Sequence, residues 1–326
     1  MKKRVLVTGG TGFLGSALVR RLVRGGYNVR VLDNNARGKI QNLTEVQKDV
    51  EFFEGDIRDP NAVLRAAKGV ESIHHLAYIN GTEYFYSKPE LVLDVAIRGM
   101  LSVIDACRAH GIGDLVLASS SEVYQTPPEI PTAENAPLSV PDVLNPRYSY
   151  GGGKIACELM AINYGRTGFE RMTIFRPHNV YGPAMGFEHV IPQFAMRAKQ
   201  LVQEKPSSSD LVFPIQGDGK QMRSFIYIDD FTEGLLSVVE KGQHMNIYHI
   251  GTQDEATIGQ VAEWVVGEFG RKAILQPGPA APGGTNRRCP NTDKLKSLGF
   301  APKVSLRDGI SRTVSWYREQ SINPKS

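Results

Sequence analysis

The stretch VLVTGGTGFLG at residues 5–15 joins a short apolar run to three glycines spaced three apart, Gly9, Gly12 and Gly15. The run favours a buried strand, and the amphipathic segment after it favours a helix. Glycines at a strand-to-helix turn permit the sharp bend and let the backbone approach a pyrophosphate, which the free N–H groups of the helix N-terminus attract. The stretch therefore predicts the phosphate-binding turn of a dinucleotide-binding fold.

An acidic residue in the expected place supports this interpretation. Asp33 ends the next predicted strand, where a carboxylate accepts hydrogen bonds from a ribose diol and repels a 2′-phosphate, which favours NAD over NADP. Arg37 and Lys39 follow closely, so NADP stays open. Asp56 ends the third predicted strand, where it either contacts the adenine or is a solvated loop acid.

Outward from this turn, β-branched apolar runs alternate with amphipathic segments. Strand alternating with helix predicts an α/β fold, a Rossmann-type doubly wound parallel sheet. After Pro177 the pattern loosens, apart from a strand and helix at 224–242. We expect an NAD-binding Rossmann domain of residues 1–177 plus 223–250 and a smaller C-terminal substrate-binding region of residues 178–222 plus 251–326. The predicted strands are 3–9, 28–34, 49–56, 71–77, 114–121 and 171–177, and the predicted helices are 12–26, 60–69, 89–111 and 148–168.

The composition excludes several classes of protein. A formal net charge of +4, spread over 326 residues, does not favour a nucleic-acid partner. The three cysteines are far apart in the sequence, which is typical of a reducing compartment without disulfides or a structural metal. The apolar run near the N-terminus has the length of a strand, unlike a signal peptide, and no apolar stretch reaches the about 20 residues of a membrane helix. We therefore expect a cytoplasmic protein without a membrane partner.

A second stretch, YSYGGGK at residues 148–154, places Tyr150 and Lys154 on one face of a predicted helix. A lysine ammonium beside the phenol, together with a bound nicotinamide cation, would lower the pKa of Tyr150 from about 10 toward neutrality. Such a tyrosine takes the proton of a hydroxyl group whose carbon loses hydride. The glycines between the two residues would leave room for cofactor or substrate, or would mark a loop-like opening turn.

The segment ASSSEV at residues 118–123 supplies a companion hydroxyl group. A serine at the carboxyl end of a parallel strand lies in the crevice where open α/β sheets bind ligands. The motifs GGTGFLG, ASSSEVY, YSYGGGK and FRPHNVYGP, in this order, resemble those of the extended short-chain dehydrogenase/reductase family whose members modify nucleotide sugars. The resemblance runs through nearly the whole chain and includes GDGKQMRSFIYIDD and RRCPNTDKLKSLGF.

This resemblance implies NAD as the cofactor and a nucleotide-diphosphate sugar as the substrate. Ser120 would orient the sugar 4-hydroxyl group, with Tyr150 as the base and Lys154 as its partner and ribose ligand. The substrate would contact Ser121, His178, Asn179, Arg223 and Arg288, where paired arginines suit a diphosphate and the alternative for each is a surface salt bridge. Beside the three glycines and Asp33, the residues implied around NAD are Phe13, Leu14, Asn34, Asp56, Ile57, Leu76, Ala77, Tyr78, Ser119, Tyr150, Lys154 and Pro177.

Members of this family oxidise C4 of the sugar and then diverge. Reduction from the other face gives a 4-epimerase, proton removal at C5 with loss of the C6 hydroxyl group gives a 4,6-dehydratase, and loss of a C6 carboxylate gives a decarboxylase. Glu122 follows two serines, which resembles UDP-glucuronate decarboxylases and GDP-mannose dehydratases, where the carboxylate lies near C5. The alternative is a glutamate that only orients a loop.

A 4-epimerase needs the fewest special groups, so the sequence favours an NAD-dependent nucleotide-sugar 4-epimerase. A 4,6-dehydratase or a UDP-glucuronate decarboxylase that uses Glu122 is the alternative. Two departures from the family pattern bear on this: Ala96 lacks the side-chain hydrogen bond expected at its position, and His178 replaces the Phe of several relatives. A regulatory, non-catalytic NAD-binding protein is a more remote alternative, which the intact Ser120, Tyr150 and Lys154 disfavour. The helices at 89–110 and 148–167 resemble the dimer helices of the family, so a homodimer is expected.

Overall fold

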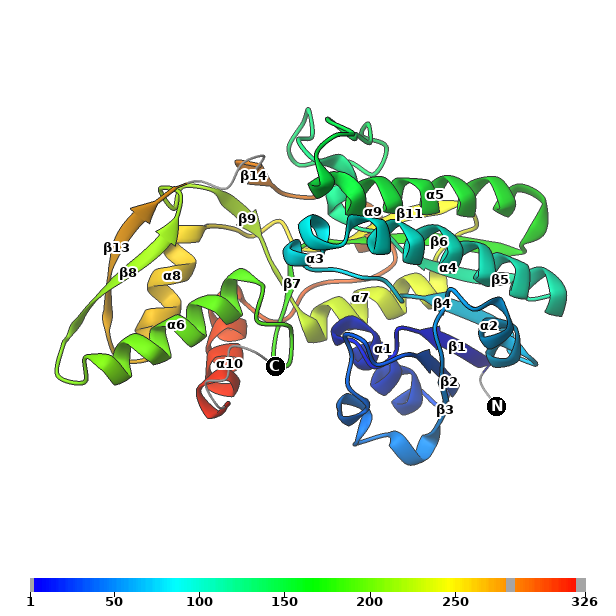
Figure 1. Cartoon of the computed structure of the whole chain (residues 1–326), viewed down its shortest axis with the longest axis horizontal. Helices are drawn as coiled ribbons and strands as arrows, with labels where there is room; N and C mark the ends of the chain where they lie inside the picture. Colours follow the sequence, from blue (N-terminus) through cyan, green and yellow to red (C-terminus); the bar gives the residue numbers. More distant parts are fainter. Residues whose placement is uncertain (1–2, 280–284, 321–326) are drawn as a thin grey trace.

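The computed structural model describes residues 3–279 and 285–320 (Figure 1). Its centre is a seven-stranded sheet with the order β11-β6-β5-β4-β1-β2-β3, in which every neighbouring pair is parallel. This arrangement confirms the predicted doubly wound sheet. The strands are β1 (Arg4–Thr8), β2 (Asn28–Asp33), β3 (Val50–Glu54), β4 (Ser72–His75), β5 (Asp114–Ala118), β6 (Arg171–Pro177) and β11 (Asn246–Ile250).

Helices cover both faces of this sheet, so the side chains of its central strands β1, β4 and β5 are almost all buried, whichever face they point to. On one face, α1 packs against α7, and on the other, α4 packs between α2 and α5. The buried side chains of β1 show the result, because Val5 and Val7 belong to the cluster with α1 and Leu6 belongs to the cluster with α4. The bounds are α1 (Phe13–Arg24), α7 (Ile228–Lys241), α2 (Pro60–Ala67), α4 (Pro89–His110) and α5 (Ser149–Gly168).

The strand order reverses at β1, which lies between β2 and β4. Strands after β1 in the chain first extend the sheet on one side, through β2 and β3, and then on the other, through β4, β5 and β6. A crevice forms at such a point beyond the carboxyl ends of the strands, because the connections leave in opposite directions. The glycine turn after β1, Asp33 at the end of β2 and the serines after β5 all lie at this edge.

The remaining elements form a smaller group, at the left of Figure 1, in which α6 packs against α8 and α10. The sequence did not predict α6, although it is 15 residues long. The division into two domains at the boundaries given above stays a prediction. The helices of this group are α6 (Val190–Glu204), α8 (Ile258–Gly267) and α10 (Leu306–Glu319), and its strands are β8 (Asp210–Gln216) and β13 (Lys272–Gly278).

Short elements connect this group to the central sheet. A three-stranded sheet has the order β12-β9-β14, and a two-stranded sheet pairs β10 with β7. The short strands are β7 (Val180–Tyr181), β9 (Met222–Ser224), β10 (Ile226–Tyr227), β12 (Glu255–Thr257) and β14 (Arg287–Arg288). The short helices are α3 (Thr82–Ser87), α9 (Asp293–Ser297), and the 3-10 turns η1 (Ile40–Leu43), η2 (Gln47–Asp49), η3 (Ser121–Tyr124) and η4 (Pro146–Tyr148).

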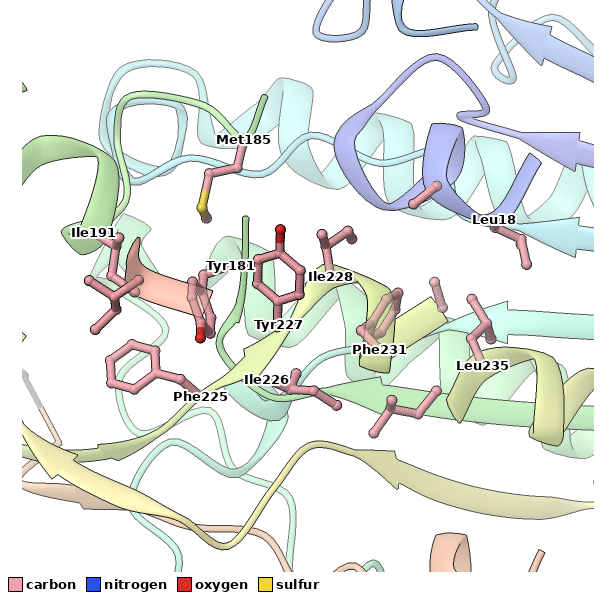
Figure 2. Close-up of a cluster of buried hydrophobic side chains, with 14 of the residues drawn as sticks. Leu18, Tyr181, Met185, Ile191, Phe225, Ile226, Tyr227, Ile228, Phe231 and Leu235 are labelled. Atoms are coloured by element: carbon pink, nitrogen blue, oxygen red, sulfur yellow. The ribbon is translucent and has the colours of Figure 1, made fainter. Parts of the chain in front are cut away.

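One cluster of buried apolar side chains continues from α1 into the smaller group (Figure 2). Leu18 of α1 lies near Leu235 and Phe231 of α7, and the row continues through the aromatic rings of Tyr227 and Tyr181, whose centroids are 5.6 Å apart. Because Tyr181 belongs to this cluster, the packing holds the segment that follows β6 in place beside the crevice. Within residues 3–279 and 285–320, no helix is long and apolar enough to cross a membrane.

Candidate active site

A cavity of about 1870 Å³ lies along the crevice at the carboxyl ends of the central strands. It is larger than the about 300–1,000 Å³ of most sites for a single small molecule, so it has room for two ligands side by side. Most of the residues singled out from the sequence line it. These are Gly9, Gly12, Phe13, Leu14, Gly15, Asp33, Asn34, Asp56, Ile57, Leu76, Ala77, Tyr78, Ser119, Ser120, Ser121, Glu122, Tyr150, Lys154, Pro177 and Asn179.

The three glycines of the first turn serve two purposes. Gly9 has φ +74°, and a Cβ atom there would lie 2.6 Å from the backbone nitrogen of Ala77. A Cβ atom on Gly15 would lie 2.0 Å from the carbonyl oxygen of Gly9. At Gly12, the N-cap of α1, the nearest atom would be 3.4 Å away, so this side of the turn is open toward the cavity. The turn is thus a cradle of backbone N–H groups that fits a pyrophosphate.

Asp33 is fixed at the end of β2. Its Oδ2 accepts a hydrogen bond from the Thr11 N–H group at 2.9 Å, and its Oδ1 accepts one from the Asn35 N–H group at 2.9 Å. Each carboxylate oxygen keeps a lone pair for a further donor, so the pair of oxygens fits a ribose diol. Asp56 also lines the cavity, and hydrogen bonds from Arg58 hold its pKa below the ordinary value. Asp56 is therefore an ion-paired residue of the cavity wall, and its contact with the adenine stays a prediction.

Ser120 and Tyr150 meet at the end of β5. Ser120 caps the short turn η3, where its Oγ accepts a hydrogen bond from the Glu122 N–H group at 3.1 Å. The phenol ring of Tyr150 is buried, stacks on Phe85 with ring centroids 4.9 Å apart and meets Tyr78 edge-on at 5.2 Å. Burial raises the pKa of Tyr150 to about 12, although a hydrogen bond with Ser120 lowers it. The two hydroxyl groups form the pair that the sequence predicted.

Lys154 is held by a backbone carbonyl group and by the Tyr78 ring, and its expected effect on Tyr150 together with a nicotinamide cation stays a prediction. Its Nζ donates to the carbonyl oxygen of Ala118 at 2.7 Å and lies 3.7 Å from the centre of the Tyr78 ring. Burial lowers the pKa of Lys154 to about 8. The protein's own groups thus leave the pKa of Tyr150 raised and not lowered, because desolvation of the phenol outweighs its polar contacts.

The three glycines after Tyr150 are part of α5 and not of a loop. A Cβ atom on Gly153 would lie 2.4 Å from the Tyr78 hydroxyl oxygen and 3.1 Å from the Ala96 Cβ. A Cβ atom on Gly151 would lie 3.0 Å from the Glu122 carbonyl oxygen. The expectation that these glycines leave room for a ligand is therefore wrong for Gly153, because the space beside it is filled by Tyr78 and by Ala96 of α4. Ala96, the departure from the family pattern, is the side chain that packs there.

Glu122 is paired with an arginine from a distant part of the chain. Arg288 Nη1 donates to Glu122 Oε1, and Arg288 Nη2 donates to Oε2 at 3.2 Å. Arg288 is in register with Arg223 on the neighbouring strand, β9. Burial would raise the pKa of Glu122, but Arg288, with Arg147 and Arg223, holds it below the ordinary value. The salt bridge that we weighed for Arg288 exists, but it is partly buried and it adjoins the cavity.

Three of the predicted substrate residues do not line this cavity: His178, Arg223 and Arg288. Arg288 reaches it through Glu122, and Arg223 lies beside Arg288. His178 is buried, its ring packs on His249 with centroids 4.6 Å apart, and neither of its ring nitrogens has a hydrogen-bond partner among the described residues. Burial lowers the pKa of His178 well below the ordinary value, so the ring is neutral. Contact between His178 and a substrate stays a prediction.

Other residues of the site did not stand out in the sequence. Arg147 lines the cavity from η4, and its buried Nε has no hydrogen-bond partner among residues 3–279 and 285–320. Its position three residues before Tyr150 was the signal that could have found it. Arg37 also lines the cavity, and its Nη2 donates to Glu188 Oε2 at 2.9 Å. This ion pair engages the guanidinium group that, in the sequence, kept NADP open as the cofactor. In the described part of the chain, no group of acidic, histidine and cysteine side chains could hold a metal ion.

Comparisons with known proteins agree with this geometry. A model of the NAD-dependent epimerase/dehydratase family matches residues 5–251. UDP-glucuronic acid decarboxylase 1 of Arabidopsis thaliana is 31% identical over 325 residues, which cover 98% of this chain and 71% of that protein. dTDP-glucose 4,6-dehydratase of Streptomyces niveus is 30% identical over 327 residues, which cover 97% of this chain and 93% of that protein.

A solved structure is similarly close. Thermus thermophilus UDP-glucose 4-epimerase in complex with NAD superimposes with a TM-score of 0.85 at 31% sequence identity, covering 98% of this chain and 100% of that one. The three similar proteins carry out three different reactions at nearly equal sequence identity. The similarity therefore establishes the family, but it does not distinguish the three reactions, which must be argued from the residues of the site.

Proposed function

The chain belongs to the NAD-dependent epimerase/dehydratase family, and we propose that it is a nucleotide-sugar 4-epimerase that acts through a transient 4-keto sugar. The observation that carries this proposal is the pairing of Ser120 with Tyr150, beside the buried Lys154, in the cavity that the glycine turn and Asp33 also line. These groups suffice for reversible oxidation at C4. The family and the presence of Ser120, Tyr150 and Lys154 together support an enzyme and not a regulatory protein without catalytic activity.

NAD fits the wall of the cavity nearest to β1. The open face of the turn at Gly12 would receive the pyrophosphate, and Asp33 would accept hydrogen bonds from the adenosine ribose. Lys154 would bind the other ribose through the ammonium protons that Ala118 does not use. When bound, NAD supplies the acceptor for the hydrogen of C4 and a positive charge beside Tyr150. The remaining residues that would surround it are Phe13, Leu14, Asn34, Asp56, Ile57, Leu76, Ala77, Tyr78, Ser119 and Pro177.

Tyr150 would take the proton of the 4-hydroxyl group, because its own hydroxyl is held against Ser120 and its ring is fixed by Phe85 and Tyr78. Ser120 Oγ already accepts from the Glu122 N–H group, so its proton is free to point toward Tyr150 or the sugar oxygen. A positive charge close to the phenol would offset the desolvation that raises the pKa of Tyr150. Return of the proton from Tyr150 completes the cycle on either face of the ketone.

The nucleotide diphosphate would bind next to the cavity, behind Glu122, because Arg223 and Arg288 do not line the cavity itself. Arg223 and Arg288 are neighbours on adjacent strands, and their guanidinium groups suit two phosphates. Asn179 lies at the cavity wall with its Nδ2 donating to the Ser224 carbonyl oxygen at 2.7 Å, which ties this wall to β9. Ser121 would contact the sugar from η3.

The choice of epimerisation over dehydration or decarboxylation depends on Glu122. A C5 base must take up a proton, whereas the charges of Arg288, Arg147 and Arg223 hold the pKa of Glu122 below its ordinary value and so make its carboxylate a weaker base. Ser121 stands where many dehydratases of sugars other than GDP-mannose carry an aspartic acid. A 4-epimerase requires neither group.

Mass spectrometry of reaction products tests this choice. Purified protein with NAD is incubated with UDP-, GDP-, CDP- and dTDP-sugars, and products are separated by chromatography. An isobaric product with a new retention time is expected for one of the sugars. Loss of water or of carbon dioxide would instead assign the 4,6-dehydratase or the decarboxylase reaction.

The outer faces of α4 and α5 support a homodimer as part of this proposal. The two helices pack side by side, and Leu93, Leu101, Leu159 and Tyr164 are exposed on them. Leu159, which is 59% exposed, is the most exposed of these four side chains, and apolar side chains exposed on two adjacent helices suit burial against a second copy. Sedimentation should give a dimer that Leu159→Glu dissociates and that Leu64→Glu on α2, a control also exposed, does not. A wild-type monomer would contradict the dimer.

A further inference from the structure

The carboxylate of Glu122 and the guanidinium of Arg288 form an ion pair that closes one wall of the cavity. The partners are 166 positions apart in sequence, and both oxygens of the carboxylate accept from the guanidinium. The side chain of Arg288 is 10% exposed and that of Glu122 is 30% exposed. Glu122 therefore stands between the cavity and an arginine that would otherwise face it.

The surroundings of this pair carry more positive than negative charge. Arg223 donates to the backbone carbonyl oxygens of Met222, Thr285 and Asn286, which bring no charge. Burial, and then the charge of Arg288, lower the pKa of Arg223 to about 10, so it stays protonated at neutral pH. The guanidinium of Arg147 has no ion-pair partner within the described residues. Glu122 is thus the acid that sits among three arginines, an arrangement that attracts a further anion.

A carboxylate and a phosphate offer an arginine the same contact. Both present two oxygen atoms at the spacing of the guanidinium fork, so the donors of Arg288 that hold Glu122 are those that a phosphate oxygen would use. The two anions cannot both take them. A phosphate that binds through these two nitrogens must therefore displace Glu122, whereas the buried Nε of Arg288 has no hydrogen-bond partner among the described residues.

We propose that Glu122 is a built-in competitor of the substrate diphosphate for Arg288, displaced from it whenever a nucleotide sugar binds. The inference rests on the proposed function, because it takes Arg288 as a diphosphate ligand. The displaced carboxylate stays beside Arg147 and Arg223, so it does not become an isolated buried charge. Its role is to weaken the hold on the nucleotide and so to favour release of product. This role needs no chemistry at C5, and it holds whichever sugar is bound.

Nucleotide binding to the NAD-loaded protein tests the competition. UDP, dTDP, GDP and CDP are titrated by calorimetry into the wild type and into Glu122→Gln, which keeps the backbone N–H group that Ser120 accepts from. Glu83→Gln is the matched control, since Glu83 lines the same cavity but forms no ion pair among the described residues. The thermal midpoint with and without nucleotide gives a second readout.

Removing the competitor is expected to tighten binding of the preferred nucleotide about ten-fold, the effect of one charge-assisted hydrogen bond. The nucleotide should also raise the midpoint of Glu122→Gln by more than that of the wild type, while Glu83→Gln changes affinity less than two-fold. If Glu122→Gln does not fold, Glu122→Asp, whose shorter carboxylate reaches Arg288 less well, should show a smaller gain.

Unchanged or weaker binding in the Glu122 variants would overturn the competition, since the carboxylate would then only support Arg288 or have no effect on it. A gain equal to that of Glu83→Gln would overturn it as well, because it would reflect general charge. Binding of none of the four nucleotides to any of these proteins would overturn the proposed function itself, and the inference with it.

Discussion

Glu158→Gln is expected to destabilise the protein by about 3 kcal/mol, because it breaks a buried ion pair and leaves one charge behind. Glu158 on α5 accepts from Arg176 on β6 through both oxygens, from Nε at 2.8 Å and from Nη2 at 2.5 Å. The two side chains are 5% and 2% exposed. The Ser119 hydroxyl also donates to Glu158, and Arg176 donates to Tyr124, so the pair supports the turn that carries Ser120.

The magnitude follows from the burial of the pair. Loss of one partner from a buried pair costs about 3–5 kcal/mol, and the lower end applies because the glutamine oxygen still accepts one hydrogen bond. The entropy of unfolding of a chain of 326 residues is about 0.7 kcal/mol/K, so the midpoint should fall by about 4 °C. The turnover number should fall as well, since Ser119, next to Ser120, donates to the same Glu158 oxygen as Arg176 Nε, and the ion pair that fixes this oxygen is lost.

Thermal unfolding followed by circular dichroism measures this change. Glu45→Gln is the control, because its ion pair with Arg24 has a similar distance, 2.7 Å, but side chains that are 66% and 64% exposed. Such a pair contributes about 0–1 kcal/mol, which is a shift of at most about 1.5 °C. Equal midpoints for the two variants would refute the reasoning that burial makes the Glu158–Arg176 pair indispensable.

Three further predictions concern α5. Tyr150→Phe should lower the turnover number by about 10²–10⁴-fold while NAD still binds, as measured by kinetics and by fluorescence titration of the cofactor; near-normal turnover would remove Tyr150 from the chemistry. Gly153→Ala should destabilise the protein by about 1–3 kcal/mol, since its Cβ would lie 2.4 Å from the Tyr78 hydroxyl oxygen, whereas Gly168→Ala, with no atom within 4 Å, should not. Equal midpoints for the two alanine variants would contradict the packing. The free energy of unfolding of Lys154→Met should exceed that of the wild type by the largest amount at pH 7. The pKa of Lys154 is lowered from 10.5 to about 8 in the folded protein, so the unfolded chain binds more protons between these values and the wild type becomes more stable as the pH rises. The wild type should then gain about 1–3 kcal/mol relative to Lys154→Met from pH 8 to pH 10.5 in denaturant unfolding, and a constant difference would contradict this pKa.

The central sheet was predictable because its evidence is local. The glycines of residues 9–15 fix the first turn, and the β-branched runs of strand length are bounded by turn residues. The helix α6 was not predictable in the same way, since Pro192 lies in its first turn and the segment before it is rich in glycine and proline, both typical of loops.

The site was predictable only in part, for a similar reason. Ser120, Tyr150 and Lys154 follow from motifs whose geometry is set within one strand end or one helix. The contact between Glu122 and Arg288 joins positions 166 apart, and no spacing rule links them. The use of Gly153 was misread because the neighbours that need the space, Tyr78 and Ala96, come from other elements.

The most direct test of the proposed reaction is to run it in D₂O and to measure carbon-bound deuterium in the product by mass spectrometry, after exchangeable deuterons have been washed out. In a 4-epimerase, the hydrogen that leaves C4 returns to C4 without passing through solvent. We therefore predict a product isobaric with its substrate and free of carbon-bound deuterium. A product that has lost water or carbon dioxide and has gained solvent deuterium at carbon would contradict the 4-epimerase and place a proton transfer at the C5 side of the sugar.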